Sequence, residues 1–289
     1  MTTSHTPRNL IYYQGSDPGD LTLIAQNDDY THVEISALHF VAPDTPKKKE
    51  GDLYLNDTLI TDVPDSFWNA VAACVQSGKT VLALLGGAGD GSFRYITDNQ
   101  GAAAKTLVAQ VISHGIDGID LDWETSDYSE AVLSDFTSVL KAALGAKLVT
   151  HSPVPGNVPY SSNWWPNGVG DIGWINVQWY GWQGEQLQQA YEALVRGSDA
   201  SPAFAADQVV VGATTAPQSG VGNVPVCTLI KTLVDIPGLP NCGNWGGVAG
   251  WDFTHTLTGP EGETQSNWST CIRAALNGET TCRGCPSPS

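Results

Sequence analysis

The chain has 289 residues, of which 41% are hydrophobic and 15% are charged, so it can bury a sizeable core and its composition does not predict disorder. Thirty acidic residues against thirteen basic ones give a net charge of −17, which repels phosphate backbones and anionic membrane surfaces and argues against nucleic acid and membranes as partners. The sequence has no apolar run of about 18 residues that could span a bilayer, and we expect one domain over residues 1–289.

Eight apolar segments with strand character follow one another along the chain. The predicted strands cover residues 9–13, 32–41, 79–85, 115–124, 147–152, 172–180, 208–213 and 247–253. Helical spacing predicts helices over residues 65–78, 99–114, 129–144, 185–196, 228–233 and 269–276. The turn-rich residues 14–19 after the first strand predict a functional loop.

The βα order over one domain length favours a (β/α)8 TIM barrel, and a doubly wound open sheet is the competing fold. A GxGxxG motif does not follow the first strand, and the glycine-rich run 86–89 lacks the Lys and Ser/Thr of a phosphate-binding loop. Nucleotide-binding open sheets are therefore disfavoured. In a barrel the chemistry lies at the C-terminal ends of the strands, where the sequence places Glu124, Tyr180 and Trp251.

Acidic residues alternate with apolar ones in the stretch 115–124, GIDGIDLDWE. Because side chains alternate sides along a strand, Asp120, Asp122 and Glu124 share one face, about 6.6 Å apart at each step. The apolar residues between them pack on the opposite layer: Ile119, Leu121 and Trp123. Crowding and burial raise the pKa of such acids, a cost typical of sites where a proton must move. The stretch predicts a carboxylate-based hydrolase.

Six cysteines, few lysines and two glycosylation sequons, at Asn56 and Asn267, favour an extracellular protein, although the N-terminus lacks the apolar segment of a secretory signal and a cytoplasmic location stays open.

Several cysteine pairings are compatible with the sequence. Cys227 and Cys242 flank a Pro/Gly-containing segment and are candidates for a loop-closing disulfide, whereas Cys74 lies in an apolar helical run and is expected to be a buried free thiol. A further pair is expected within the C-terminal cluster formed by Cys271, Cys282 and Cys285. A zinc site needs about four ligands, so we rank metal binding below a disulfide.

Residues 117–124, DGIDLDWE, match in full the DxxDxDxE signature of glycoside hydrolase family 18, and the chain resembles that family. The family's S-x-G-G motif is similar to residues 84–87, in which Leu84 replaces the serine. Its sixth-strand motif is similar to residues 178–180, and its eighth-strand tryptophan corresponds to Trp251. The spacing leaves no room for an α+β insertion domain, so the resemblance implies one catalytic barrel over about residues 8–278 with a short Cys-containing tail.

The resemblance also implies a role for each matching residue. Glu124 is the expected general acid and base, Asp122 binds the acetamido N–H of the substrate, and Asp120 tunes Asp122. Tyr180 holds the acetamido oxygen as this oxygen attacks the anomeric carbon, and Trp251 lies beneath that sugar. The substrate thus supplies the nucleophile, and the reaction retains stereochemistry.

Further residues are expected to bind substrate or support the motif. The expected substrate-binding residues are Gln178, Trp182, Gly86 and Gly87, although a simple strand-to-loop turn is an equally good explanation of the two glycines. Asp117 is expected to be structural. We expect no cofactor and no metal.

Two departures from the family pattern affect the details. Leu84 removes a hydroxyl group that could bond the inner aspartates, and Gly181 stands where many family chitinases have Asp or Asn. Several tryptophans favour a cleft that stacks sugars, although burial in the core is an equally good explanation for most of them: Trp164, Trp165, Trp174, Trp179 and Trp182.

Three functions are compatible with the sequence. The first is an endo-acting chitinase, with chitin as partner and the protein as a monomer. The second is an endo-β-N-acetylglucosaminidase that cuts the chitobiose core of N-glycans. A sugar-binding lectin on the same fold is disfavoured, because such proteins typically lose the catalytic glutamate and Glu124 is present.

Overall fold

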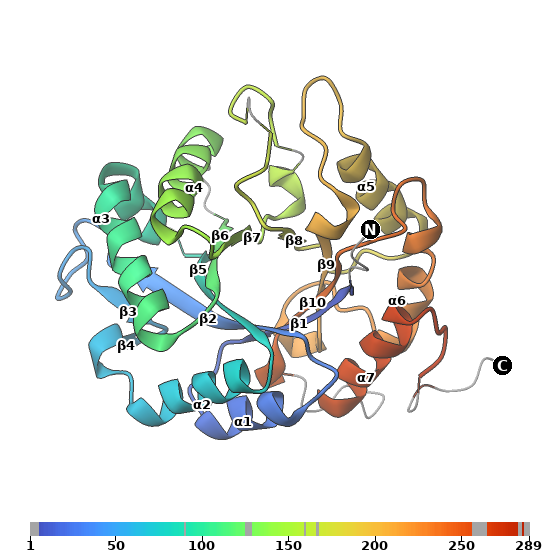
Figure 1. Ribbon diagram of the computed structural model, residues 1–289, viewed down its shortest axis with the longest axis horizontal. Helices are drawn as coiled ribbons and strands as arrows, with labels where there is room; N and C mark the ends of the chain where they lie inside the picture. Colours follow the sequence, from blue (N-terminus) through green and yellow to red (C-terminus); the bar gives the residue numbers. More distant parts are fainter. Residues whose placement is uncertain are drawn as a thin grey trace.

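The computed structural model describes residues 6–89, 91–124, 129–158, 160–165, 168–255, 265–282 and 285. Parallel strands close into a barrel, because β1 pairs with β2 on one side and with β10 on the other (Figure 1). In order around the barrel the strands are β1 Arg8–Tyr13, β2 His32–Phe40, β5 Thr80–Gly87, β6 Gly118–Trp123, β7 Leu148–His151, β8 Ile175–Val177, β9 Val209–Thr214 and β10 Gly247–Trp251. The predicted (β/α)8 barrel is confirmed, and the open sheet is wrong.

Helices surround the barrel and connect its successive strands (Figure 1). They are α1 Pro18–Gln26, α2 Asp65–Gln76, α3 Gly91–His114, α4 Glu130–Leu144, α5 Gly184–Arg196, α6 Val226–Leu233 and α7 Gln265–Leu276. Between β7 and β8 the described residues form only the 3-10 turn Pro155–Asn157. Among the helices described, none combines the length and the apolar character needed to cross a membrane.

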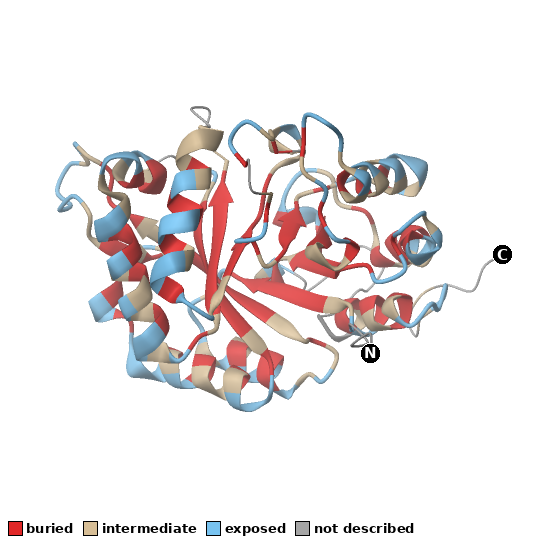
Figure 2. Cartoon of the chain, turned by 45° about the horizontal axis from the view of Figure 1, so that its top comes forward, coloured by how far each residue is buried: buried red, intermediate tan, exposed pale blue. Residues whose placement is uncertain are grey.

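Two layers of side chains build the core. The outer layer joins the strands to the helices, whose outward faces are exposed (Figure 2). It includes Ile119, Leu121 and Trp123 from β6. A smaller apolar cluster, which includes Leu10, Leu82 and Leu84, occupies the barrel interior. The predicted alternation along β6 is therefore confirmed, and its acids point into the barrel.

Three segments differ from the prediction. The expected loop 14–19 runs into helix α1, since Asp17 caps the helix by accepting the Gly19 N–H at 2.8 Å and Pro18 occupies its first turn. Helix α3 starts earlier than residue 99, with a non-helical residue at Asn99. Residues 53–59 form a short hairpin, β3 Leu53–Leu55 and β4 Thr58–Leu59, whose first strand pairs antiparallel with the end of β2.

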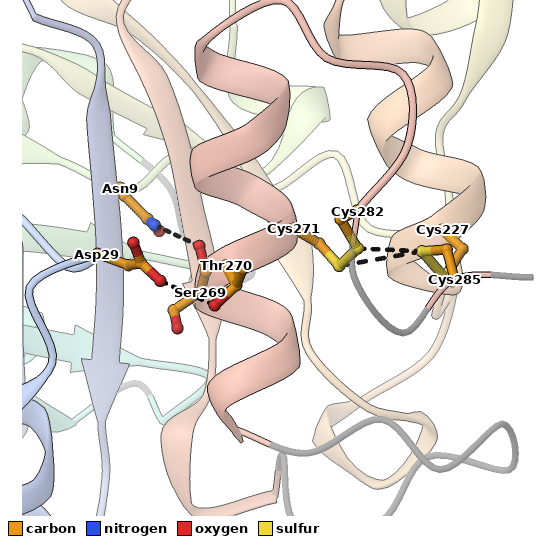
Figure 3. The surroundings of a disulfide bond; sticks show 8 residues. All are labelled: Asn9, Asp29, Cys227, Ser269, Thr270, Cys271, Cys282 and Cys285. Carbon is orange, nitrogen blue, oxygen red and sulfur yellow. Dashed lines mark hydrogen bonds between the residues drawn. A yellow bond between two sulfur atoms is a disulfide. The ribbon is translucent and has the colours of Figure 1, made fainter.

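The cysteine pairing agrees with the expectations except at Cys227 and Cys242. Disulfides join Cys227 to Cys285 and Cys271 to Cys282, attaching the C-terminal segment to α6 and α7 (Figure 3). The expected Cys227–Cys242 pair is wrong, since Cys242 is a buried free thiol and its expected partner bonds a cysteine 58 residues away. The expected pair within the C-terminal cluster and the buried thiol of Cys74 are confirmed.

Candidate active site

A cavity of about 680 Å³ opens where the C-terminal ends of the barrel strands meet the loops. Residues from seven strands or the loops that follow them line the cavity, and they include the glycine-rich run 86–89 and residues 219–221. The side chains include Gln14, His39, Asp122, Glu124, Gln178, Tyr180 and Trp251. This volume suits a ligand of several rings rather than a single small ion.

The acids of β6 form a column that runs from the barrel interior to the cavity. Asp120 is completely buried below the cavity, Asp122 is 5% exposed in its wall, and Glu124 is partly exposed at its end. Gln178 joins the upper two acids, since its Nε2 donates to Asp122 Oδ1 at 2.9 Å and to Glu124 Oε1 at 2.7 Å. The amide therefore holds the two carboxylates at fixed positions beside the cavity.

Hydroxyl groups from β7 hold the innermost acid. Thr150 Oγ1 and Ser152 Oγ both donate to the carboxylate of Asp120, and Ser152 Oγ also pairs with the Tyr12 hydroxyl at 2.7 Å. Leu84 stands directly opposite Asp120 in the strand register and offers it no hydroxyl. Where β5 offers no hydroxyl group, Asp120 thus receives two from the other side, one from Thr150 of β7 and one from Ser152 directly after β7.

Burial and mutual repulsion decide where protons reside in the column. Burial raises the pKa of Asp120 to about 6, although the bonded hydroxyl groups favour its ionised form. The pKa of Asp122 lies well above its ordinary value, first because of burial and then because of the charges of Glu124 and Asp120. Burial and the same acids raise the pKa of Tyr180. Burial and crowding thus make Asp120 and Asp122 bind protons more readily than carboxyl groups in water do.

A fourth acid lies beside the column and was missed by the sequence reasoning. Glu34 of β2 is completely buried, and both burial and the charge of Asp120 raise its pKa. A signal was present, because Glu34 is the one acid within the apolar strand His32–Phe40. A single acid lacks the alternating pattern that marks β6, so it did not stand out.

Glycines at two places allow close approach of the backbone. Gly86 has a φ of 110°, and a Cβ there would overlap the carbonyl oxygen of Asp122 and the ring of Phe93. Close approach to β6 therefore explains Gly86 better than a simple turn does. Gly181 has a φ of 83° and packs on the backbone of Gly222, which leaves no space for the Asp or Asn expected from the family pattern.

Most of the tryptophans considered for sugar stacking lie away from the cavity. Trp251 borders it and packs edge-on against Tyr12, with 5.4 Å between ring centroids. Trp182 packs against Trp179 and does not contribute to the cavity lining. Burial in the core accounts for three others, Trp165, Trp174 and Trp179. Trp164 is 52% exposed and also lies outside the lining.

Asp117 lies at the opposite end of β6 from the cavity. Its Oδ2 accepts the Val81 N–H at 2.9 Å and so ties the start of β6 to β5. This contact fits the structural part expected for it.

The sequence reasoning also missed cavity residues that come from loops and neighbouring strands. Gln14, from the loop 14–19 that the sequence predicted to be functional, lines the cavity. Two other lining residues were not predicted: His39, whose pKa is lowered by burial, and Val221, which is 93% exposed. These residues belong to no recognisable motif, so only the closure of the barrel identifies them.

Comparisons with known proteins agree with this architecture. The sequence profile described as Glycosyl hydrolases family 18 matches residues 8–220. No curated protein matches the chain.

Solved structures also resemble the chain. Chitinase ChiC from Aspergillus fumigatus is 28% identical, with a TM-score of 0.71, and the match covers 94% of this chain and 99% of that one. A fungal endo-β-N-acetylglucosaminidase of family 18 is 25% identical, with a TM-score of 0.72, covering 93% and 98%. A family 18 chitinase from Pseudoalteromonas aurantia shares the fold at 21% identity and a TM-score of 0.73, covering 93% and 99%.

Proposed function

Because this chain belongs to family 18 of the glycosyl hydrolases, we propose that it is an endo-acting, retaining chitinase that hydrolyses β-1,4 bonds between N-acetylglucosamine units. The observation that carries this proposal is the acid column, which ends with Asp122 and Glu124 joined by Gln178 in the wall of a cavity of about 680 Å³. Such an arrangement supplies both a proton donor and a negative charge next to a bound sugar.

Glu124 is the proposed general acid and base. It lies nearest the cavity opening among the acids of the column, where it can reach the glycosidic oxygen of a bound oligosaccharide. Its proton goes to the leaving oxygen as the C–O bond breaks, while the acetamido oxygen of the substrate forms a bond to the anomeric carbon. Glu124 then removes a proton from the water that opens this cyclic intermediate, so the product retains the original configuration.

Asp122 is proposed to bind the acetamido N–H and stabilise the positive charge of the cyclic intermediate. Asp120 tunes that acid from below, and Tyr180 holds the acetamido oxygen during its attack. Trp251 provides an apolar surface for the sugar ring. Support for these roles comes from position, since all but Asp120 line the cavity and Asp120 lies directly beneath it.

The second candidate is an endo-β-N-acetylglucosaminidase acting on the chitobiose core of N-glycans. Its support is the 25% identical fungal enzyme of that activity, which covers nearly the same part of the chain as the 28% identical chitinase. Both reactions break the same type of bond, so the acid column does not distinguish them. The end of β2 at His39 and the loop at Val221 line the cavity, and we expect them to contact the flanking sugars and to decide between the two.

Product analysis on two substrates tests the proposal. Purified protein is incubated with chitin hexasaccharide or with a high-mannose glycoprotein, and released products are identified by mass spectrometry, with the Glu124→Gln variant as control. Internal cleavage of the hexasaccharide alone supports the chitinase, whereas release of the glycan alone supports the second candidate. Binding without any product from the wild-type protein would favour a lectin and overturn the proposal.

We further propose an extracellular, monomeric protein whose catalytic barrel spans about residues 8–278. The two disulfides support the location, because such bonds persist mainly in oxidising compartments.

A further inference from the structure

The barrel interior contains a fully buried carboxyl group that the proposed reaction does not use. Glu34 stands opposite Tyr12 of β1 and Leu82 of β5 in the strand register, and its exposed fraction is 0%. It does not line the cavity, so a substrate would not touch it. Burying a carboxyl group is costly unless the group is neutral or well paired, so its retention calls for a physical reason.

Neighbouring side chains fix which oxygen of Glu34 carries the proton. The indole Nε1 of Trp174 donates to Asn176 Oδ1 at 3.0 Å, and since an indole N–H can only donate, this contact fixes the orientation of the Asn176 amide. Asn176 Nδ2 then donates to Glu34 Oε1 at 2.9 Å. Oε1 is therefore an acceptor, whereas the buried Oε2 accepts no hydrogen bond from the described residues, so a proton on Glu34 belongs on Oε2.

The titratable groups that face Glu34 are both acids. Asp120 approaches from β6 and Tyr12 from β1, while Leu82 of β5 is apolar and Asn176 of β8 is neutral. Burial first, and then the charge of Asp120, raise the pKa of Glu34 well above its ordinary value. A hydrogen bond from Glu34 in turn favours the ionised form of Asp120. Hydrogen bonds from Asn176 and Tyr12 lower the pKa of Glu34, but by less than burial raises it. A proton on Glu34 is thus in position to be donated to Asp120.

We propose that Glu34 is a positioning residue of the active site, which donates a hydrogen bond from Oε2 to Asp120 and thereby keeps Asp120 ionised beneath Asp122. This inference rests on the proposed function. Together with Thr150 and Ser152 it surrounds the Asp120 carboxylate with donors, although β5 supplies leucine where the family has serine. An ionised Asp120 places a negative charge beneath Asp122, and this charge favours the cationic intermediate of the proposed reaction.

Three variants separate this role from simple packing. Glu34→Leu removes the donor and should lower kcat about tenfold, the loss expected for a hydrogen bond to a charged group. Asp120 should then bind a proton more readily, so the acidic limb of the kcat/KM profile should move to higher pH. Glu34→Gln keeps a neutral donor and should restore the position of that limb and most of kcat. Leu82→Ala, a buried neighbour in register with Glu34, should lower stability and leave the pH profile unchanged.

Infrared difference spectra provide a readout that does not depend on turnover. At neutral pH the wild type minus Glu34→Gln spectrum should show the carbonyl band of a protonated carboxyl group. Absence of that band would mean that Glu34 is ionised, and it would overturn the inference. So would a Glu34→Leu profile that coincides with the wild-type profile, or a Glu34→Gln variant as impaired as Glu34→Leu. If the wild type cleaves neither chitin nor N-glycans, the proposed function fails while the spectrum still decides the protonation of Glu34.

Discussion

Two buried polar clusters of this barrel differ in how completely their groups are paired. On the outer face of β7, His151 is 1% exposed and both ring nitrogens are bonded, Nε2 to Thr137 Oγ1 and Nδ1 to the Tyr160 hydroxyl, each at 2.9 Å. The Thr137 hydroxyl donates to the Leu133 carbonyl, so it accepts from Nε2–H, and Nδ1 accepts from the tyrosine. The ring is neutral, since burial lowers its pKa to about 3.

The acids inside the barrel show the opposite arrangement. Four carboxyl groups lie close together, and one buried oxygen of Glu34 accepts no hydrogen bond from the described residues. None of the groups that shift the pKa of Glu34, Asp120 or Asp122 is a cation. A buried polar group that serves stability is neutral and fully paired, as His151 is. Acids crowded at a cost to stability indicate a site that moves protons.

The largest expected effect is on the proposed proton donor. Glu124→Gln should lower the hydrolysis rate about a thousandfold or more, because the amide cannot transfer a proton, while the affinity for chitin oligosaccharides changes little. Initial rates and calorimetric titrations measure the two quantities. The exposed Glu185 provides a matched Glu→Gln control that should hydrolyse at the wild-type rate. Near-wild-type turnover in Glu124→Gln would show that another group is the acid.

Asp122→Asn should separate stability from activity. We expect turnover to fall about a hundredfold, because the amide cannot stabilise the cationic intermediate. The folded state should nevertheless gain about 1 kcal/mol at neutral pH. Because the pKa of Asp122 is raised in the folded protein, this group stabilises the wild type below about pH 4. That stability is lost as the pH rises towards the pKa of Asp122 in the folded state. Asparagine does not ionise, so the variant does not lose it.

Denaturant unfolding of the wild type and Asp122→Asn at pH 5 and pH 8 measures this difference, which should be larger at the higher pH. If Asp122→Asn is less stable than the wild type at both pH values, burial of the acids does not reduce the stability of the folded protein, and this interpretation is wrong.

Tyr180→Phe should have a smaller kinetic effect. Its hydroxyl is proposed to bond the acetamido oxygen most strongly during attack, so kcat should fall about thirtyfold while KM changes little. Steady-state kinetics on chitin oligosaccharides give both parameters. A proportional loss of substrate binding would instead assign Tyr180 to ground-state recognition.

The smallest effect is expected in the paired cluster. His151→Gln should cost about 1 kcal/mol of stability at pH 8, because one of the two hydrogen bonds is lost, and the rate per folded molecule should stay at the wild-type value. The lowered pKa of His151 stabilises the wild type above about pH 6.5 and this contribution is lost as pH falls towards 3, so the variant should lose less stability on acidification. An equal loss in both proteins would show that His151 does not titrate on unfolding.

Local patterns in the sequence determined the barrel and the acid column of β6, from Asp120 to Glu124. Strand alternation placed Ile119 and Leu121 on one side of β6 and the acids on the other, because successive side chains of a strand point in opposite directions. Cys74 was identified as a buried free thiol from helical spacing alone. The start of α1 was also readable, since Asp17 and Pro18 have the chemistry of a helix start, but these residues were interpreted as a turn.

Only the tertiary structure decided which distant residues meet. Thr150 and Ser152 bond Asp120 because β7 lies next to β6, and Glu34 joins the acids because strands from opposite parts of the chain line one interior. The Cys227–Cys285 disulfide likewise joins cysteines 58 residues apart. Such contacts depend on strand register and barrel closure, which no local period encodes. Periodicity therefore indicates which side of a strand a residue faces, whereas the closed barrel decides which residues it contacts there.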